Sequence, residues 1–167
     1  MPKVIAYIGL GSNLDQPEQQ LDNAIEALKG LPQSTLVSSS SFYRSKALTL
    51  DGDSSIPDYL NAVVVLQTEL DPYSLLDELQ TVEFAQGRVR TEQRWQSRPL
   101  DLDILLYADE IMTSERLTIP HPEICQRDFV LVPLAEITPD LVIPGHGKVS
   151  AYLDSCQQTL LEKIPAK

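Results

Sequence analysis

Hydrophobic residues change their spacing along the chain, and each change predicts a helix or a strand. Residues 4–8 are almost continuously apolar, which is typical of a strand buried on both faces. The glycine-rich segment 9–13 predicts a turn that ends this strand. Asp15 and Pro17 are suited to the start of a helix, and apolar residues then recur along one helix face until Gly30. We therefore expect a strand, a turn and a helix in that order.

The same reasoning divides the next part of the chain. Residues 35–45 and 59–66 are rich in β-branched and aromatic residues and predict two strands. A second helix is expected to begin at Asp71 and to end at Gly87. A further strand is expected over residues 101–107. The resulting order, β-α-β-β-α-β, is the pattern of a ferredoxin-like fold.

Three elements are expected after this core: a short strand at 117–119, a helix around 123–136 and a terminal helix around 150–162. The predicted fold class is therefore α+β, with a ferredoxin-like βαββαβ core and a C-terminal helical extension. Helices on both faces of the sheet would make three layers, α/β/α. We expect a single domain over residues 1–167.

The composition and net charge indicate which kinds of binding partner the protein has. The chain has 167 residues, of which 43% are hydrophobic, and a net charge of −11. This charge disfavours general binding to nucleic acid or to an acidic membrane surface. Cys125 and Cys156 have no metal-type spacing, and neither a secretory signal nor an apolar run of about 20 residues accompanies them. We expect a cytoplasmic monomer with small-molecule partners.

The most informative polar residues lie between Gly87 and Tyr107. Asp101 and Asp103 begin an apolar run, and on a strand they would share one face with Cα atoms about 6–7 Å apart. Paired carboxylates on a rigid element are suited to one or two magnesium ions. An arginine cluster beside them is suited to a polyphosphate. The pattern therefore indicates metal-assisted phosphoryl transfer, and the clustered arginines are Arg88, Arg90, Arg94 and Arg98.

Both features also have a plainer explanation. An isolated Asp-x-Asp pair is more often the polar face of an edge strand, and an arginine run is usually a solvated loop. Here aliphatic residues flank both aspartates, and carboxylates entering a buried strand are costly without cations. The arginine segment also contains Trp95, the only tryptophan, and loops on rigid scaffolds concentrate binding residues. The functional interpretation is favoured for both.

Three other features carry a weaker signal. Tyr59 and Asn61 would share a strand face, where a ring can stack and an amide can bind the edge of a flat heterocycle. A cross-strand pair without a ligand is the alternative. The segment 9–13 lacks the spacing of a known phosphate-binding fingerprint. His121 lies between two prolines and has no second ligand at metal spacing, so a zinc site is not expected.

Taken in order, these motifs resemble the 6-hydroxymethyl-7,8-dihydropterin pyrophosphokinase family of folate biosynthesis. The resemblance extends from Ala6 to about Pro144 and rests on several ordered blocks. The matching blocks are Tyr7-Ile8-Gly9-Leu10-Gly11-Ser12-Asn13-Leu14, Ser41-Phe42-Tyr43, Asp58-Tyr59-Leu60-Asn61-Ala62, Gln86-Gly87-Arg88-Val89-Arg90, Arg94-Trp95-x-x-Arg98-x-Leu100-Asp101-Leu102-Asp103-Ile104, Pro120-His121-Pro122 and Arg127-x-Phe129-Val130-Leu131-x-Pro133-Leu134.

The resemblance implies transfer of pyrophosphate from ATP to the hydroxymethyl group of a reduced pterin, with release of AMP. Asp101 and Asp103 would bind two magnesium ions, and Arg88 and Arg98 would contact the transferring group. The residues implied in ATP binding are Gln80, Glu83, Arg90, Trp95, Ile104, Arg116, Thr118, His121 and Arg127.

The resemblance also implies a pterin pocket. The ring would stack between Tyr59 and Phe129, and Asn61 would bind its edge. The backbone at Ser45 and Leu48 would complete the pocket.

The chain departs from the family pattern at Lys46-Ala47, Gln96-Ser97 and Pro99, which bear on the pterin loop and on the arginine loop. From the residues alone, two other functions remain open. A magnesium-dependent nucleotide hydrolase would turn over ATP without a pterin. A non-enzymatic ferredoxin-like nucleotide sensor would bind ATP and release no AMP.

Overall fold

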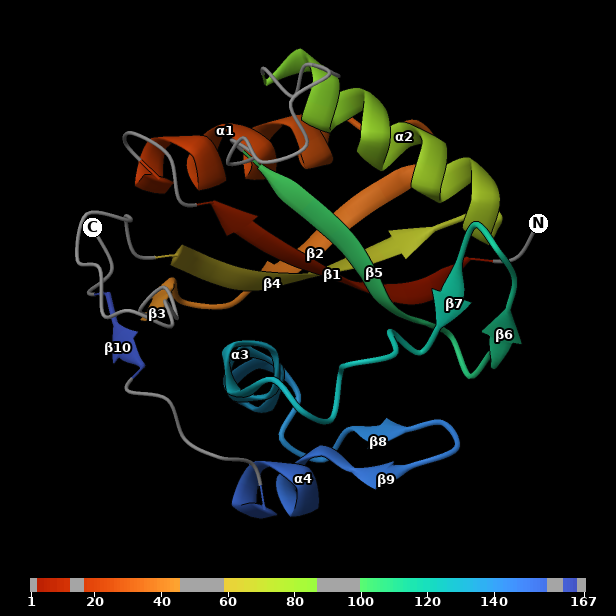
Figure 1. Ribbon diagram of the computed structural model, residues 1–167. Helices are drawn as coiled ribbons and strands as arrows, with labels where there is room; N and C mark the ends of the chain where they lie inside the picture. The colour runs from red at the N-terminus through yellow and green to blue at the C-terminus, as the bar shows by residue number, and fades with distance from the viewer. Residues whose placement is uncertain (1–2, 13–16, 46–58, 87–99, 156–160, 165–167) are drawn as a thin grey trace.

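The computed structural model describes residues 3–12, 17–45, 59–86, 100–155 and 161–164, and its architecture is α+β (Figure 1). The elements in chain order are β1 (Val4–Ser12), α1 (Pro17–Lys29), β2 (Ser34–Ser39), β3 (Tyr43–Ser45), β4 (Tyr59–Thr68), α2 (Pro72–Ala85), β5 (Asp101–Tyr107), β6 (Met112–Thr113), β7 (Thr118–Ile119), α3 (Asp128–Ile137), β8 (Val142–Ile143), β9 (Gly147–Lys148), α4 (Val149–Ser155) and β10 (Glu162–Lys163).

One antiparallel sheet forms the centre of the structure. Its strand order is β10-β3-β4-β1-β5, and β2 also pairs with β4. Two short hairpins, β6–β7 and β8–β9, lie outside this sheet. The helices α1 and α2 cover one face of the sheet, and α3 and α4 lie on the other side (Figure 1).

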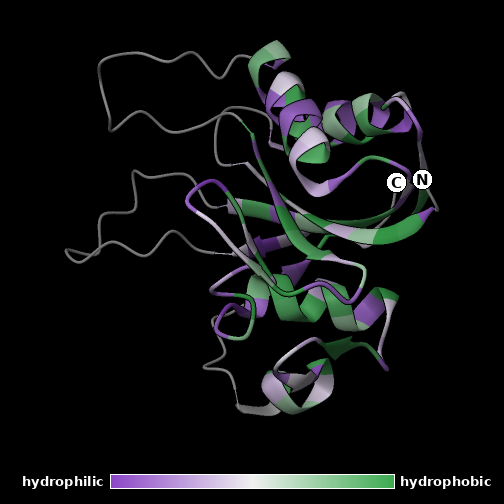
Figure 2. Cartoon of the chain, turned by 90° about the vertical axis from the view of Figure 1, so that its right-hand side faces the viewer, coloured by the Kyte–Doolittle hydropathy of each residue, from purple (hydrophilic) through white to green (hydrophobic). Residues whose placement is uncertain are grey.

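The two faces of the sheet have separate hydrophobic clusters. One cluster joins α1 and α2 to alternate residues of β1, β4 and β5, and the second joins α3, β8 and α4 to the opposite face. Figure 2 shows strands coloured mainly as hydrophobic between the two helical layers. Burial on both sides explains why the central strands have long apolar runs. None of the helices described is long and apolar enough to cross a membrane.

The first strand is longer than the sequence predicts. Residues 9–12, predicted as a turn, continue β1 as far as Ser12. β1 lies between β4 and β5 and pairs with both over this stretch, with Gly9 opposite Val63 on one side and Asp103 on the other. Two neighbouring ladders hold the backbone extended even where its residues have low strand propensity.

The single strand predicted over 35–45 is two strands, β2 and β3. The pairing of β2 with β4 changes register between Leu36 and Ser38 and ends at Ser39. Ser40 then makes two hydrogen bonds to Val63: its N–H donates to the carbonyl oxygen at 2.8 Å, and its Oγ accepts from the Val63 N–H at 2.9 Å. A side chain thus replaces a backbone partner, and regular pairing resumes at β3.

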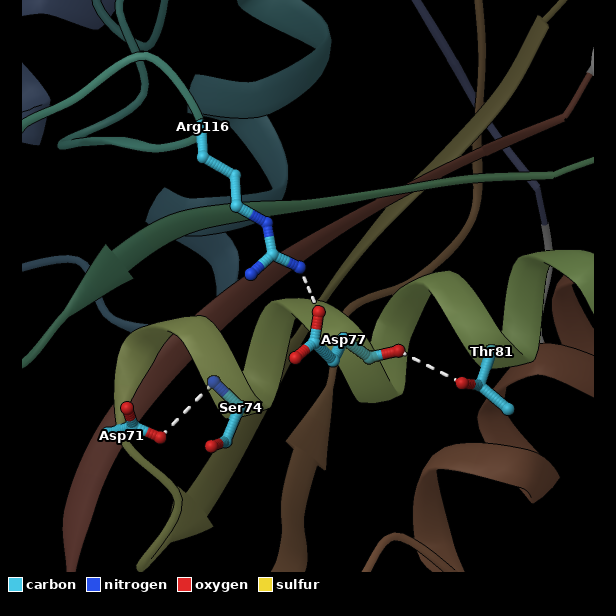
Figure 3. Close-up of polar contacts among 5 residues, drawn as sticks. All are labelled: Asp71, Ser74, Asp77, Thr81 and Arg116. Carbon is cyan, nitrogen blue, oxygen red and sulfur yellow. Dashed lines mark hydrogen bonds and ion pairs between the residues drawn. The ribbon is translucent and has the colours of Figure 1, made fainter.

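The prediction for the second helix is confirmed at its start. Asp71 caps α2, because its carboxylate accepts a hydrogen bond from the Ser74 N–H at 3.2 Å. Figure 3 shows this contact at the first turn of the helix. The strand predicted over 101–107 is β5, and β7 matches the short strand predicted near 117–119.

The helices after β5 are shorter than predicted. The helix expected around 123–136 begins only at Asp128, because Arg127 has an extended backbone with φ −115° and ψ 109°. The terminal helix expected at 150–162 corresponds to α4 (Val149–Ser155); residues 156–160 lie outside the described residues, and Glu162 belongs to β10 rather than to a helix. The β8–β9 hairpin forms where no strand was predicted.

Tyr107 connects the end of β5 to the segment before α2, since its buried hydroxyl donates to the Leu70 carbonyl oxygen at 2.5 Å. Tyr107→Phe should lower the free energy of unfolding by about 1–2 kcal/mol, because it removes a buried hydrogen bond. Tyr152→Phe is the control, since its hydroxyl makes an exposed 3.1 Å bond to the His146 carbonyl. Urea denaturation should show a larger loss for the first variant; equal losses would contradict this role for Tyr107.

Candidate active site

One row of residues crosses four strands of the sheet. Tyr43 of β3 pairs with Asn61 of β4, Asn61 pairs with Gly11 of β1, and Gly11 pairs with Asp101 of β5. The amide predicted to bind a heterocycle and one of the predicted metal ligands are therefore separated by a single strand. That strand contributes a residue without a side chain between them.

Asp101 and Asp103 point away from α1 and α2. Leu102 and Ile104 alternate with them along β5 and belong to the cluster beneath those helices. Successive side chains of a strand point to opposite faces, so both carboxylates are on the α3 side of the sheet. Asp101 is half-buried and Asp103 is exposed. The prediction that the two aspartates share a strand face is confirmed.

Asn61 points to the same side of the sheet. Its neighbours Leu60 and Ala62 are both in the cluster beneath α1 and α2, which leaves Asn61 on the α3 side. Its side chain is 5% exposed and donates a hydrogen bond from Nδ2 to Ser45 Oγ at 2.9 Å. Because one amide hydrogen is already used in this contact, the orientation of the amide is fixed.

Gly11 leaves little room for any other residue. A Cβ atom placed there would lie 3.3 Å from Oδ1 of Asn61, which is tighter than an ordinary van der Waals contact. A Cβ atom at Gly9 would lie 3.3 Å from Cδ2 of Leu105. The two glycines therefore allow neighbouring side chains to pass close over the backbone of β1.

Glu83 lies behind the two aspartates, in the last turns of α2. It is 3% exposed, and its Oε2 accepts a hydrogen bond from the Leu102 N–H at 2.9 Å. A carboxylate buried this deeply requires hydrogen bonds or positive charge to be stable. The contact fixes the backbone of β5 between Asp101 and Asp103. Gln80, one turn earlier in α2, is exposed.

His121 approaches the aspartates from the segment after β7. The backbone N–H of His121 donates to the Leu105 carbonyl oxygen at 3.0 Å, and Nδ1 of its ring accepts from the Glu123 backbone N–H at 3.1 Å. Burial lowers the pKa of His121, the charge of Arg127 lowers it further, and the charges of Asp103 and Glu123 oppose this. The imidazole is therefore neutral at pH 7, and it lies within electrostatic reach of Asp103.

Arg127 and Phe129 lie where α3 begins. The guanidinium carbon of Arg127 is 5.3 Å from the centre of the Phe129 ring, which is a cation–π distance. Arg127 also forms an ion pair with Glu123. Phe129 is half-buried, whereas Tyr59, at the start of β4, is 37% exposed. Both aromatic residues predicted to stack on a ring are thus accessible in part.

Arg116 reaches from the β6–β7 hairpin to α2, as Figure 3 shows. It forms an ion pair with Asp77, and its guanidinium carbon is 5.8 Å from the centre of the Tyr73 ring. Thr118, on β7, is half-buried. Ile104 is 3% exposed with its side chain in the core, so only its backbone is available to a ligand.

Comparison with known proteins identifies the family. The family model described as 7,8-dihydro-6-hydroxymethylpterin-pyrophosphokinase (HPPK) matches residues 7–139. The chain belongs to the HPPK family. A 2-amino-4-hydroxy-6-hydroxymethyldihydropteridine pyrophosphokinase of Haemophilus influenzae is 55% identical over 85% of this chain and 86% of its own. One of the same name from Pseudomonas aeruginosa is 42% identical over 95% of this chain and 96% of its own.

Solved structures of HPPK-DHPS proteins have the same fold. One, in complex with substrates, has a TM-score of 0.70 at 15% identity and covers 93% of this chain. Another, the Plasmodium falciparum wild type with pterin and p-hydroxybenzoate, has a TM-score of 0.67 at 15% identity and covers 92%. This HPPK chain spans 43% of each of those longer chains.

The carboxylates of this HPPK chain fit the magnesium that the family resemblance implies. No group of three or more His, Cys, Asp or Glu residues able to hold a metal occurs within the part of the chain that the structure describes. Magnesium is commonly bound by only one or two carboxylates together with substrate phosphates and water. Asp101 and Asp103 provide oxygen ligands on one strand face, so a bound polyphosphate would supply the rest.

Five of the predicted site residues lie outside the residues that the structure describes: Leu48, Arg88, Arg90, Trp95 and Arg98. Among the described residues, the fold brings Asp101, Asp103 and Asn61 to one side of the sheet. The charge of Asp103 also acts on His121, whose pKa it raises. Arg116 and Gln80 belong to the α2 side of the molecule, where Arg116 pairs with Asp77.

Sequence reasoning missed one polar contact beside this HPPK site. The Glu136 carboxylate, on α3, accepts hydrogen bonds from Ser41 and Tyr43, which lie 95 and 93 positions away along the chain. Ser41 and Tyr43 stand in a block that resembles the family, but no local pattern connects them to Glu136. Only the fold brings these residues together.

Gly11→Ala tests the close contact between β1 and Asn61. The substitution should destabilise the protein by about 1 kcal/mol relative to Gly30→Ala, because Asn61 is held by Ser45 and cannot move aside. At Gly30 a Cβ atom has its nearest neighbour at 3.6 Å, so alanine there should be neutral or stabilising by about 0.4–1 kcal/mol. Chemical denaturation measures the free energy of unfolding of both variants. Equal values would show that the Asn61 side chain moves aside without a cost in stability.

Proposed function

We propose that this chain transfers pyrophosphate from ATP to the hydroxymethyl group of 6-hydroxymethyl-7,8-dihydropterin in folate biosynthesis. Membership of the HPPK family supports this activity. The structural observation that carries the proposal is the row from Asn61 through Gly11 to Asp101. It puts the Asn61 amide, proposed to bind the pterin, and the Asp101 carboxylate, proposed to bind metal, on one side of the sheet with only Gly11 between them.

In this proposal the pterin lies on the α3 side of β4. Asn61, fixed by Ser45, binds the polar edge of the ring. Tyr59 and Phe129 stack on the two ring faces, and the backbone at Ser45 and Leu48 completes the pocket. Aromatic stacking supplies apolar contact, while the amide provides a donor and an acceptor that fix the ring orientation.

ATP binds beside the pterin, toward β5 and β7. We propose that the nucleotide is held by Gln80, Glu83, Arg90, Trp95, Ile104, Arg116, Thr118, His121 and Arg127. When two magnesium ions are bound by Asp101 and Asp103, they supply neutralisation and orientation of the phosphate oxygens. His121 can serve as a hydrogen-bonding group in this site.

The hydroxymethyl oxygen attacks the β-phosphorus, and the bond from this phosphorus to the oxygen of the α-phosphate breaks. AMP is the leaving group, and the proton of the attacking hydroxyl is released. Such a transfer requires alignment and charge stabilisation more than covalent participation of the protein. We propose that Arg88 and Arg98 contact the transferring group, where they stabilise charge in the transition state.

The two other functions considered from the residues are not favoured. A nucleotide hydrolase has no use for Tyr59, Asn61 and Phe129, and a nucleotide sensor has no use for transfer to a second substrate. Both would also be unexpected in a chain with 55% identity to a protein named as a pyrophosphokinase.

We further propose that the core is ferredoxin-like. The strand order from β5 through β1 and β4 to β2 and β3, antiparallel throughout, supports this description. In this arrangement β2 and β3 together take the place of one strand of the βαββαβ pattern. The helices α1 and α2 then occupy a single face, which leaves the opposite face for the pterin and for the carboxylates of Asp101 and Asp103.

Asp101→Ala and Asp103→Ala should each abolish most AMP release while the protein stays folded, because both residues are ligands rather than core groups. Asp109→Ala is the control, since this exposed aspartate follows β5 outside the proposed site. The assay measures AMP with ATP and magnesium, in the presence and absence of the dihydropterin. Near-normal turnover in both variants at saturating magnesium would refute the metal assignment, and release independent of pterin would indicate a hydrolase.

Asp77→Asn should strengthen ATP binding by about two- to fivefold, because the ion pair with Asp77 competes with phosphate for Arg116. Glu78→Gln is the matched control on the same helix. Calorimetry with an ATP analogue that cannot be cleaved gives both affinities. Weaker binding in the Asp77 variant would show that Asp77 orients Arg116 for ATP instead of competing with it.

A further inference from the structure

A cluster of polar contacts connects α3 to the sheet at the edge of the proposed pterin pocket. Glu136 accepts hydrogen bonds from the Ser41 N–H at 3.2 Å to Oε1 and 3.1 Å to Oε2, and from Ser41 Oγ at 2.9 Å. The Tyr43 hydroxyl donates to Oε1 at 2.5 Å. One carboxylate therefore holds both the segment before β3 and the first residue of that strand.

The charges at this cluster favour the contact. Partial burial raises the pKa of Glu136, but the hydrogen bonds from Tyr43 and Ser41 and the charge of Lys163 outweigh it and lower the pKa below its usual value. Burial, the bond to Glu136 and its charge raise the pKa of Tyr43. At neutral pH the carboxylate is therefore ionised and the phenol is a donor, which gives strong charge-assisted hydrogen bonds.

Both elements that Glu136 connects also carry residues of the pterin pocket. On β3, Tyr43 pairs with Asn61, and Ser45 Oγ accepts the hydrogen bond that orients the Asn61 amide. On α3, Phe129 lies seven residues before Glu136, which is two helical turns and about 10 Å along the same side of the helix. The carboxylate thus fixes β3 to the helix whose other end bears the stacking ring.

We infer that Glu136 is a positioning residue for the pterin: it sets the separation between β3, with Ser45, and α3, with Phe129. This inference rests on the proposed function, since it requires that these two elements form the walls of the pocket. Glu136 is exposed and Ser41 is half-buried, so the contacts between these two residues contribute modestly to global stability. Tyr43 is buried, and loss of the carboxylate would also weaken the bond of its hydroxyl, so stability is measured beside ligand affinity.

Glu136→Gln tests this role in the full-length chain. The amide keeps the size of the side chain, and its one oxygen can still accept from Tyr43 and the Ser41 N–H, but it lacks the second acceptor used by Ser41 Oγ and the negative charge that strengthens all of these bonds. We expect the affinity for 6-hydroxymethyl-7,8-dihydropterin to fall about five- to tenfold, the range for the loss of one or two hydrogen bonds. ATP affinity and the single-turnover rate with both ligands saturating should stay within about twofold. Tyr43→Phe, which removes one donor, should show a smaller loss of pterin affinity.

Glu162→Gln is the matched control. Glu162 lies on β10, at the same edge of the sheet, and its carboxylate pairs with Arg44 at 3.4 Å. Its substitution should leave the affinity for both ligands unchanged. Thermal denaturation of all variants shows whether any loss of affinity comes from loss of the folded state.

Two outcomes would overturn the inference. Pterin affinity within twofold of wild type in Glu136→Gln would reduce the carboxylate to a structural contact. A parallel loss of ATP affinity, or of the rate at saturation, would show that it acts on the whole fold. The Asn61→Ala variant distinguishes failure of the positioning role from failure of the proposed pocket. Unchanged pterin affinity in Asn61→Ala would refute the proposed pocket. Weaker pterin binding in Asn61→Ala, together with unchanged pterin binding in Glu136→Gln, would refute only the positioning role.

Discussion

The pairing of β1 with two neighbours at once is the constraint on which the site depends. The register that puts Gly11 opposite Asn61 also puts it opposite Asp101, so one strand sets the separation of two proposed ligand-binding groups. A side chain on β1 at that point would occupy the space where the ligands are expected to meet. The hydrophobic residues that alternate with the glycines, buried beneath α1 and α2, enforce the register, because a shift by one residue would turn them to the opposite face of the sheet and remove them from this cluster.

Polar contacts then fix the groups that the register brings together. Glu83 holds the backbone of β5 between the two aspartates, and Ser45 holds the amide of Asn61. In both cases a buried polar side chain forms a hydrogen bond with a second polar group, which would otherwise lower the stability of the fold by being buried without a partner. The site is thus built on a rigid sheet, and the side chains of Glu83 and Ser45 orient its proposed ligating atoms.

Much of this arrangement could be predicted from the sequence, because it depends on local periodicity. The spacing of Asp101 and Asp103 and the apolar run around them were enough to predict a shared strand face. The full length of β1 could not be predicted, because residues 9–12 favour a turn locally. They form a strand only because they pair with both β4 and β5. The contact between Glu136 and Tyr43 was beyond prediction as well, because it depends on how α3 packs against the sheet.

The position of β5 at the end of the sheet has a consequence for solubility. A terminal strand presents backbone donors and acceptors that can pair with another chain, and such edges are common starting points for aggregation. The Leu102 N–H is occupied by the buried Glu83 carboxylate, and Asp101 and Asp103 place negative charge on either side of it. The residues proposed to bind magnesium and ATP on this strand therefore also protect the edge from pairing with a second strand.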